Sequence, residues 1–259
     1  MKFTRNLIAL TGVAMLGAIA NAGPNGFYYL ASGSDLWRLQ GTVDQSAVTN
    51  TGNEYNIAVG GDIRTTSQRN STPGAQYSIN GVYTGTDYPG DWKGFFDGTT
   101  DGTSNYTIDW DSGDVYKFDR NWANGNVMFT LGGGGSGEFL GITYDPGNNS
   151  LWVSGWNSAI VMNLDMNGNI LSRFAPTFNN ITCLGMDYSD GSLWMGSQLT
   201  EGTFYNYKTN GSFLGSESYA DMVGVNTLGG EFNAVPEPCT MALLGLGAAV
   251  TAFRARRRR

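Results

Sequence analysis

Three observations predict an all-β fold for this chain of 259 residues. Charged residues make up only 14% of the chain, while glycine, asparagine, serine and threonine, which suit short strands and tight turns, are abundant. Short apolar runs are separated by Asp-Pro-Gly, Asp-Gly or Asn-Gly, the residues that tight hairpins require. The pattern returns at steps of 42 or 43 residues. A period near forty with about four strands predicts a β-propeller of about five blades.

The chain begins with a segment, residues 1–22, that is typical of a secretory signal peptide. Two basic residues precede an apolar core at residues 7–19, and Ala20 and Ala22 form an A-x-A cleavage site. The alternative is an N-terminal membrane anchor, but the apolar run is short and ends in small residues. We therefore expect signal peptidase to act after Ala22 and the body, residues 23–234, to be exported.

The repeat is clearest in the second half of the body. Residues 141–154 correspond to residues 185–196, each with a short apolar run, a turn and a Leu-Trp pair, so that Trp152 and Trp194 lie 42 residues apart. A single blade cannot cover both faces of its own sheet. We expect these tryptophans to fill the space between neighbouring blades.

Weaker copies of the pattern lie in residues 106–129, 28–39 and 55–84. The repeat resembles those of NHL and SMP-30-like β-propellers, and the length of the body then implies about five blades. A β-sandwich is the alternative fold, since it also contains short alternating strands. A sandwich does not require a tryptophan at the same position of each repeat.

Three polar stretches without apolar periodicity are predicted to be surface loops: Thr42–Asn53, Ser67–Gln76 and Asp87–Ser104. Four aromatic residues lie in or near such loops: Trp92, Phe95, Phe96 and Trp122. If they are exposed, they form a rim on which sugar rings could stack. Packing beneath the long loops is the alternative.

The charge of the body excludes nucleic acid as a partner. Residues 23–235 hold eight Lys and Arg against twenty-one Asp and Glu, so the surface repels phosphate backbones. The chain has no histidine, which removes the usual general base and every Ser-His-Asp arrangement. Cys183 lies in an apolar run and is predicted to be a buried thiol. We predict no catalytic residue.

Calcium is the one cofactor for which the sequence offers candidate ligands, and these are Asp109, Asp111 and Asp114. Their spacing resembles the opening of a calcium loop. The full EF-hand pattern fails, because its sixth position is Asp114 where glycine is needed and its twelfth is Arg120 where glutamate is needed. A turn between two strands of a blade explains the same residues.

A metal-dependent hydrolase is the alternative function. SMP-30-like and lactonase-like propellers hold a metal at the mouth of the axis with acids and asparagine, and Asp145, Asp187 and Asn163 are the candidates in this chain. Asp145 and Asp187 occupy equivalent repeat positions, which favours turn or strand-cap roles. An enzyme needs three or four such side chains at one axial point, whereas a structural module has a plugged or apolar axis.

The last segment, residues 235–259, has three parts. Pro236, Glu237 and Pro238 cannot lie inside a helix, and Met241–Phe253 is uncharged and apolar. A cluster of arginines then acts as a membrane stop signal: Arg254, Arg256, Arg257, Arg258 and Arg259. A helix of residues 239–253 would reach about 22 Å against a hydrocarbon core of about 30 Å, which suits a single, transient transmembrane helix.

This tail resembles the PEP-CTERM sorting signal of Gram-negative bacteria, although Cys239 stands where serine is expected. The resemblance implies an inner-membrane intermediate, removal of the tail by the transpeptidase exosortase, and delivery to the cell surface or an extracellular matrix. We expect the body to be a non-catalytic binding or structural module associated with exopolysaccharide.

Overall fold

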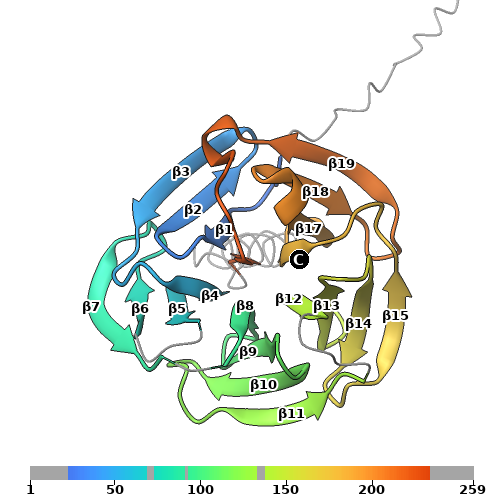
Figure 1. Cartoon of the computed structure of the whole chain (residues 1–259), viewed down its shortest axis with the longest axis horizontal. Helices are drawn as coiled ribbons and strands as arrows, with labels where there is room; N and C mark the ends of the chain where they lie inside the picture. Colours follow the sequence, from blue (N-terminus) through green and yellow to red (C-terminus); the bar gives the residue numbers. More distant parts are fainter. Residues whose placement is uncertain (1–22, 69–72, 91–92, 133–137, 234–259) are drawn as a thin grey trace, which may run out of the picture.

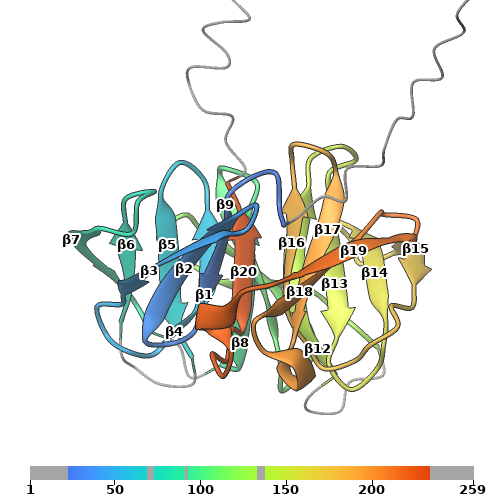
Figure 2. The ribbon, with the colours of Figure 1, turned by 90° about the horizontal axis from the view of Figure 1, so that it is seen from above.

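The computed structural model describes residues 23–68, 73–90, 93–132 and 138–233. Figure 1 shows five four-stranded sheets arranged around one axis, and Figure 2 shows the same ring from the side. The predicted five-bladed β-propeller is therefore confirmed. The predicted signal peptide with Ala20 and Ala22, and the tail with its sorting motif, arginines and helix, lie outside the described residues. Within the described part of the chain, no helix is long and apolar enough to cross a membrane.

Each blade is an antiparallel sheet whose four strands follow one another from the axis outward. Blade 1 contains β20 (Gly229–Phe232), β1 (Tyr28–Ala31), β2 (Asp35–Gln40) and β3 (Val43–Val48). Blade 2 contains β4 (Glu54–Val59), β5 (Ile63–Ser67), β6 (Gly74–Tyr77) and β7 (Tyr83–Tyr88). Blade 3 contains β8 (Phe95–Thr100), β9 (Ser104–Asp109), β10 (Asp114–Asp119) and β11 (Asn126–Thr130). Blade 4 contains β12 (Phe139–Asp145), β13 (Ser150–Gly155), β14 (Val161–Asp165) and β15 (Ile170–Phe174). Blade 5 contains β16 (Ile181–Asp187), β17 (Ser192–Ser197), β18 (Thr203–Tyr207) and β19 (Phe213–Ser218).

Blade 1 closes the ring. Its innermost strand, β20, comes from the end of the body and pairs antiparallel with β1, with Tyr28 opposite Phe232 and Ala31 opposite Gly229. The rings of Tyr28 and Phe232 stack with their centroids 4.5 Å apart. The two ends of the body are thus held in one sheet, which closes the ring of blades.

The repeated tryptophans occupy equivalent places. Trp152 and Trp194 lie in β13 and β17, each the second strand of its blade, and both are buried. Trp152 belongs to a buried cluster that includes Leu184 of blade 5, and Trp194 belongs to one that includes Leu30 of blade 1. The prediction that they fill the spaces between blades is confirmed.

The Asn-Gly turns join the third and fourth strands of several blades. Gly168 has φ +86°, a conformation that L-residues rarely adopt, and it lies over Phe129 of the preceding blade. A Cβ at this position would be 2.7 Å from the Phe129 ring. Gly211 is placed in the same way over Phe174. These glycines therefore allow close packing between blades as well as a tight turn.

The three loop predictions were wrong in part, because each stretch contains a strand. Val43–Val48 is an outer strand, Gly74–Tyr77 is a third strand, and Phe95–Thr100 is an innermost strand. The outer strand is largely exposed and can be polar. The innermost strand is rich in Gly, Thr and Asp because its polar groups form hydrogen bonds next to the axis. The outer strand and the innermost strand therefore do not need the apolar alternation on which the loop predictions depended.

Candidate functional site: the axis and the arginine pair

The axis is surrounded by the five innermost strands β4, β8, β12, β16 and β20 (Figure 1). Each of these strands contacts the next around the ring. Glycine permits the closest approaches: a Cβ at Gly229 of β20 would lie 2.0 Å from the carbonyl oxygen of Tyr55 in β4. The backbones therefore come close enough for one side chain to contact several blades.

Asp97 of β8 is that side chain. Its Oδ1 accepts hydrogen bonds from the backbone N–H groups of Gly98 at 2.9 Å and Gly230 at 2.7 Å. Its Oδ2 accepts from Ile142 and Leu184, both at 3.0 Å. The residue is completely buried. One carboxyl group thus links strands of blades 1, 3, 4 and 5.

Burial raises the pKa of the Asp97 carboxyl well above its usual value, because the charged form loses its hydration. The four N–H groups oppose this rise, since all of them donate to the carboxylate and bind its charged form. Because these donors occupy both oxygens, the carboxylate has a structural role at the centre of the ring.

Glu231 of β20 is the second axial acid, and it is also completely buried. It accepts a 2.8 Å hydrogen bond from the N–H of Phe232, one from the Thr143 hydroxyl at 3.2 Å, and a long one from Tyr188 at 3.5 Å. The Thr143 oxygen in turn accepts the N–H of Met186. Burial raises the pKa of Glu231 well above its usual value, and the charge of nearby Asp97 adds to the effect.

The acids chosen from the sequence for an axial metal site do not meet at the axis. Asp145 and Asp187 end β12 and β16, where they accept N–H groups of turn residues, Gly147 at 2.8 Å and Ser189 at 2.9 Å. Asn163 lies in β14, the third strand of its blade. The interpretation of Asp145 and Asp187 as turn or strand-cap residues is correct. Glu231 was missed, and Asp97 was missed as an axial residue because no sequence repeat marks either position.

The calcium candidates surround the turn between β9 and β10. Asp109 is buried and accepts the N–H of Gly94 at 2.9 Å and of Asp111 at 3.2 Å. The Ser112 hydroxyl contacts the carboxylates of both Asp109 and Asp114. These contacts account for the spacing of the acids as turn geometry. Among the residues that the structure describes, no group of three or more acidic or cysteine side chains is arranged to hold a metal ion.

The predicted aromatic rim is wrong for Phe95 and Trp122, which are both buried between blades 2 and 3. The Trp122 Nε1 donates to the carbonyl of Arg64 across that boundary. Phe96 is half-buried and contacts the ring of Trp110. Trp92 lies outside the described residues. Two of the four aromatics thus fill space between blades, which the polar sequence around them does not reveal.

An open hollow of about 220 Å³ lies between blades 1 and 2. Its apolar wall includes Leu36, Ile63 and Ile79. On its polar side the Arg38 guanidinium donates to Asn80 at 2.9 Å and also to Gln45. It lies over the Phe27 ring, 4.7 Å from the centroid. A hollow with apolar walls and one fixed polar group has the character of a ligand-binding surface.

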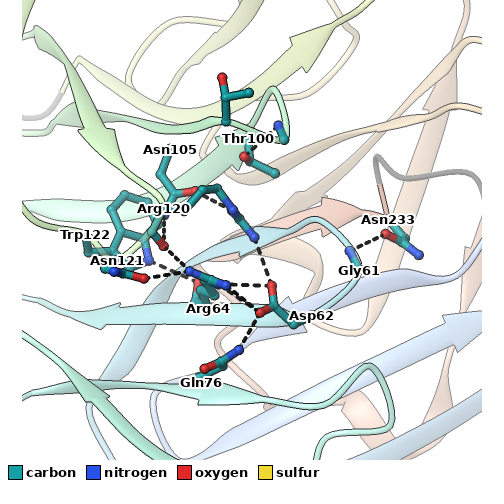
Figure 3. Close-up of polar contacts among 12 residues, drawn as sticks. Gly61, Asp62, Arg64, Gln76, Thr100, Asn105, Arg120, Asn121, Trp122 and Asn233 are labelled. Atoms are coloured by element: carbon teal, nitrogen blue, oxygen red, sulfur yellow. Dashed lines mark hydrogen bonds and ion pairs between the residues drawn. The ribbon is translucent and has the colours of Figure 1, made fainter.

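A polar cluster bridges blades 2 and 3 around Asp62, Arg64 and Arg120 (Figure 3). Asp62 forms ion pairs with the Arg64 Nη2 at 2.8 Å and with the Arg120 Nη2 at 2.9 Å. The Arg64 Nη1 donates to the Arg120 carbonyl at 3.0 Å, and the Arg120 Nη1 donates to Asn105. We call Arg64 and Arg120 the arginine pair. Two cations in this cluster share one carboxylate.

Residues 234–259 match the family model of the PEP-CTERM protein-sorting motif. The chain therefore carries this motif, which implies export and exosortase-mediated sorting to the cell surface in bacteria. No curated protein sequence matches the chain.

Solved structures share the fold. A chain in the crystal structure of a nidogen/laminin complex has a TM-score of 0.57 and 11% identity, with 81% of this chain and 99% of that chain covered. The glutaminyl cyclase of Myxococcus xanthus has a TM-score of 0.53 and 11% identity, with 76% of each chain covered. A protein of unknown function from Bacteroides thetaiotaomicron VPI-5482 has a TM-score of 0.52 and 13% identity, with 73% and 57% covered. At these identities the similarity shows the propeller fold alone.

Proposed function

We propose that this protein is an exported surface or matrix protein whose propeller is a non-catalytic binding or structural module. The claim that the propeller is non-catalytic rests on the hydrogen bonding of Asp97. A catalytic carboxylate must turn an oxygen toward substrate, metal or water. Both oxygens of Asp97 instead receive backbone N–H groups from four blades. Asp97 therefore holds four of the blades together at the axis.

The claim that the protein is exported to the surface or matrix rests on the match of residues 234–259 to the sorting motif. In our proposal signal peptidase removes residues 1–22, the tail is held transiently in the inner membrane of a Gram-negative bacterium, and exosortase then cleaves near Pro236–Pro238. Mass spectrometry of protein recovered from the cell surface tests this sequence of events. We expect the peptide ending at Arg259 to be lost in the native host and retained when exosortase is deleted. Surface protein that still ends at Arg259 in the native host would contradict the proposal.

Association with exopolysaccharide is the partner that we propose for the body, at the hollow between blades 1 and 2. The apolar walls suit the face of a sugar ring, and the fixed Arg38 guanidinium suits a hydroxyl or carboxylate group. Co-sedimentation of the processed protein with polysaccharide purified from its host tests this. We expect Arg38→Ala to lower binding at least five-fold, while Lys208→Ala, which removes an exposed cation of blade 5, leaves binding unchanged. Equal binding by both variants would exclude this surface.

The metal-dependent hydrolase is the second candidate, and one observation favours it: Asp97 and Glu231 are two acids at the axis. A panel of lactone and ester substrates, assayed with added Ca²⁺ or Mn²⁺, tests it. Turnover that disappears in the Glu231→Gln protein would favour the hydrolase over the structural module.

A further inference from the structure

A row of four aromatic side chains runs from blade 2 to blade 4. The ring centroid of Phe96 lies 6.4 Å from that of Tyr55 and 5.6 Å from that of Trp110. The ring of Trp110 lies 5.2 Å from that of Trp156. Neighbouring rings are inclined by 60° to 76°, so they are not stacked flat on one another. All four residues are half-buried, and we call them the aromatic row.

The aromatic row lies on the face of the ring where the innermost strands begin. Tyr55 and Phe96 are the second residues of β4 and β8. Trp110 and Trp156 directly follow the ends of β9 and β13, the second strands of their blades. In an antiparallel pair the start of one strand lies beside the end of its partner, so all four residues share this face. A Cβ at Gly229, where β20 begins, would lie 2.0 Å from the carbonyl oxygen of Tyr55 and 2.9 Å from that of Phe96.

The two tryptophans of the row differ from the other described tryptophans in their indole N–H groups. Among the residues that the structure describes, the Nε1 atoms of Trp110 and Trp156 have no hydrogen-bond acceptor, and neither atom is buried. The Tyr55 hydroxyl is likewise accessible and has no partner among those residues. Elsewhere the indole nitrogen is bonded to protein (Trp122, Trp152) or buried (Trp37, Trp194). The aromatic row therefore offers three polar groups to a ligand.

Backbone hydrogen bonds fix the two tryptophans of the row. The N–H of Trp110 donates to the carbonyl of Gly94 at 3.0 Å. The N–H of Trp156 donates to the carbonyl of Glu138 at 2.6 Å, and its own carbonyl accepts the N–H of Asn180 at 2.9 Å. Little of the row needs to be ordered when a ligand binds, which lowers the entropy cost of binding.

We infer that the aromatic row binds a neutral polysaccharide chain. The C–H face of a sugar ring packs on an aromatic ring, and sugar hydroxyls can bond to the indole N–H groups of Trp110 and Trp156 and to the Tyr55 hydroxyl. None of the four side chains is charged. The excess of acidic residues in the body repels polyanions, so an uncharged chain is favoured.

This inference rests on the proposed association with exopolysaccharide, and it adds a second contact surface and a chemical class of ligand. The aromatic row shares no residue with the hollow between blades 1 and 2. The two surfaces can therefore be tested separately.

Fluorine NMR of the full chain labelled with 5-fluorotryptophan tests the inference. The ligand added is the neutral fragments of the host's polysaccharide, made by partial hydrolysis and separated from acidic fragments by anion exchange. We expect the resonances of Trp110 and Trp156 to shift as neutral fragments are added. Trp110→Phe and Trp156→Phe identify these resonances by their loss. The resonance of Trp152, which is buried, should stay in place.

Substitutions measure what each part of the row contributes to affinity. Followed at the Trp110 resonance, Trp156→Ala should weaken binding at least about ten-fold. Trp156→Phe keeps a ring but loses the N–H, so it should weaken binding by a smaller factor. Tyr83→Ala removes an exposed aromatic of β7 outside the row and should bind like the wild type. Arg38→Ala should leave the shifts of Trp110 and Trp156 unchanged.

If neutral fragments leave the Trp110 and Trp156 resonances unchanged, the inference is wrong. Shifts caused by acidic fragments alone would also overturn it, because the ligand would then be a polyanion. Unchanged resonances in a protein that still co-sediments with polysaccharide through Arg38 would exclude the aromatic row and leave the proposed function standing. A wild-type protein that neither shifts nor co-sediments would overturn both. If Trp156→Ala does not fold, as judged by the Trp152 resonance, Trp156→Phe serves in the same titration.

Discussion

The Oδ1 of Asp97 lies 2.7 Å from the backbone nitrogen of Gly230, a residue 133 positions later in the chain. Asp97 belongs to blade 3, and Gly230 belongs to the strand that completes blade 1. The same carboxyl group reaches blades 4 and 5 through Ile142 and Leu184. The closing strand is therefore tied both to its own sheet and to the centre of the ring.

Replacing Asp97 by Asn should destabilise the protein by about 2–4 kcal/mol, because one oxygen becomes an NH₂ group that faces two backbone N–H donors. Urea unfolding followed by circular dichroism measures the change. Asp221→Asn, at an exposed aspartate, is the control and should change stability by less than about 0.5 kcal/mol. Equal stability of the two variants would mean that the axial hydrogen bonds contribute little.

Replacing Glu231 by Gln should change how stability depends on pH. Because burial raises the pKa of Glu231 in the folded state, its contribution is complete below the pKa of the unfolded chain. That contribution is lost as pH rises toward the folded value. The wild-type protein should therefore lose more stability than Glu231→Gln between pH 5 and pH 8. Urea midpoints at three pH values measure this, and parallel pH profiles would contradict it.

The two repeated tryptophans should differ in their response to the same substitution. The Nε1 of Trp152 donates to Asp145 at 3.1 Å, whereas that of Trp194 is buried without a hydrogen-bond acceptor among the described residues. Trp152→Phe should cost about 1 kcal/mol more than Trp194→Phe, since only the first loses a hydrogen bond. Guanidinium unfolding of both variants, followed by far-ultraviolet circular dichroism, measures the difference. A larger cost at Trp194 would show that the hydrogen bond is not what distinguishes them.

Gly168→Ala should cost at least about 1 kcal/mol more than Gly191→Ala. Both glycines have positive φ, +86° and +73°, so both variants suffer similar backbone strain. Only at Gly168 would the new methyl group meet Phe129, whereas nothing lies within 4 Å at Gly191. Thermal and urea unfolding of the pair separate packing between blades from turn strain. Equal losses would show that the turn can shift away from Phe129.

Some of the fold could be read from neighbouring residues along the chain. The turns around Gly168 and Gly211, the phase of Trp152 and Trp194, and the number of blades were predicted correctly because they depend on local turn chemistry and on spacing. The strand Phe95–Thr100 was predicted as loop, since its side chains serve partners in other blades. The assignment of Phe95 and Trp122 to an exposed rim failed for the same reason.

The sequence by itself determined the all-β class, the blade repeat and the sorting motif, because short-range residue patterns specify each of them. Only the tertiary structure decided that Asp97 and Glu231 occupy the axis and that Arg64 and Arg120 share Asp62. These arrangements join residues that are tens to more than a hundred positions apart. Ring closure brings them together, and no local pattern in the chain specifies which polar groups will then be neighbours.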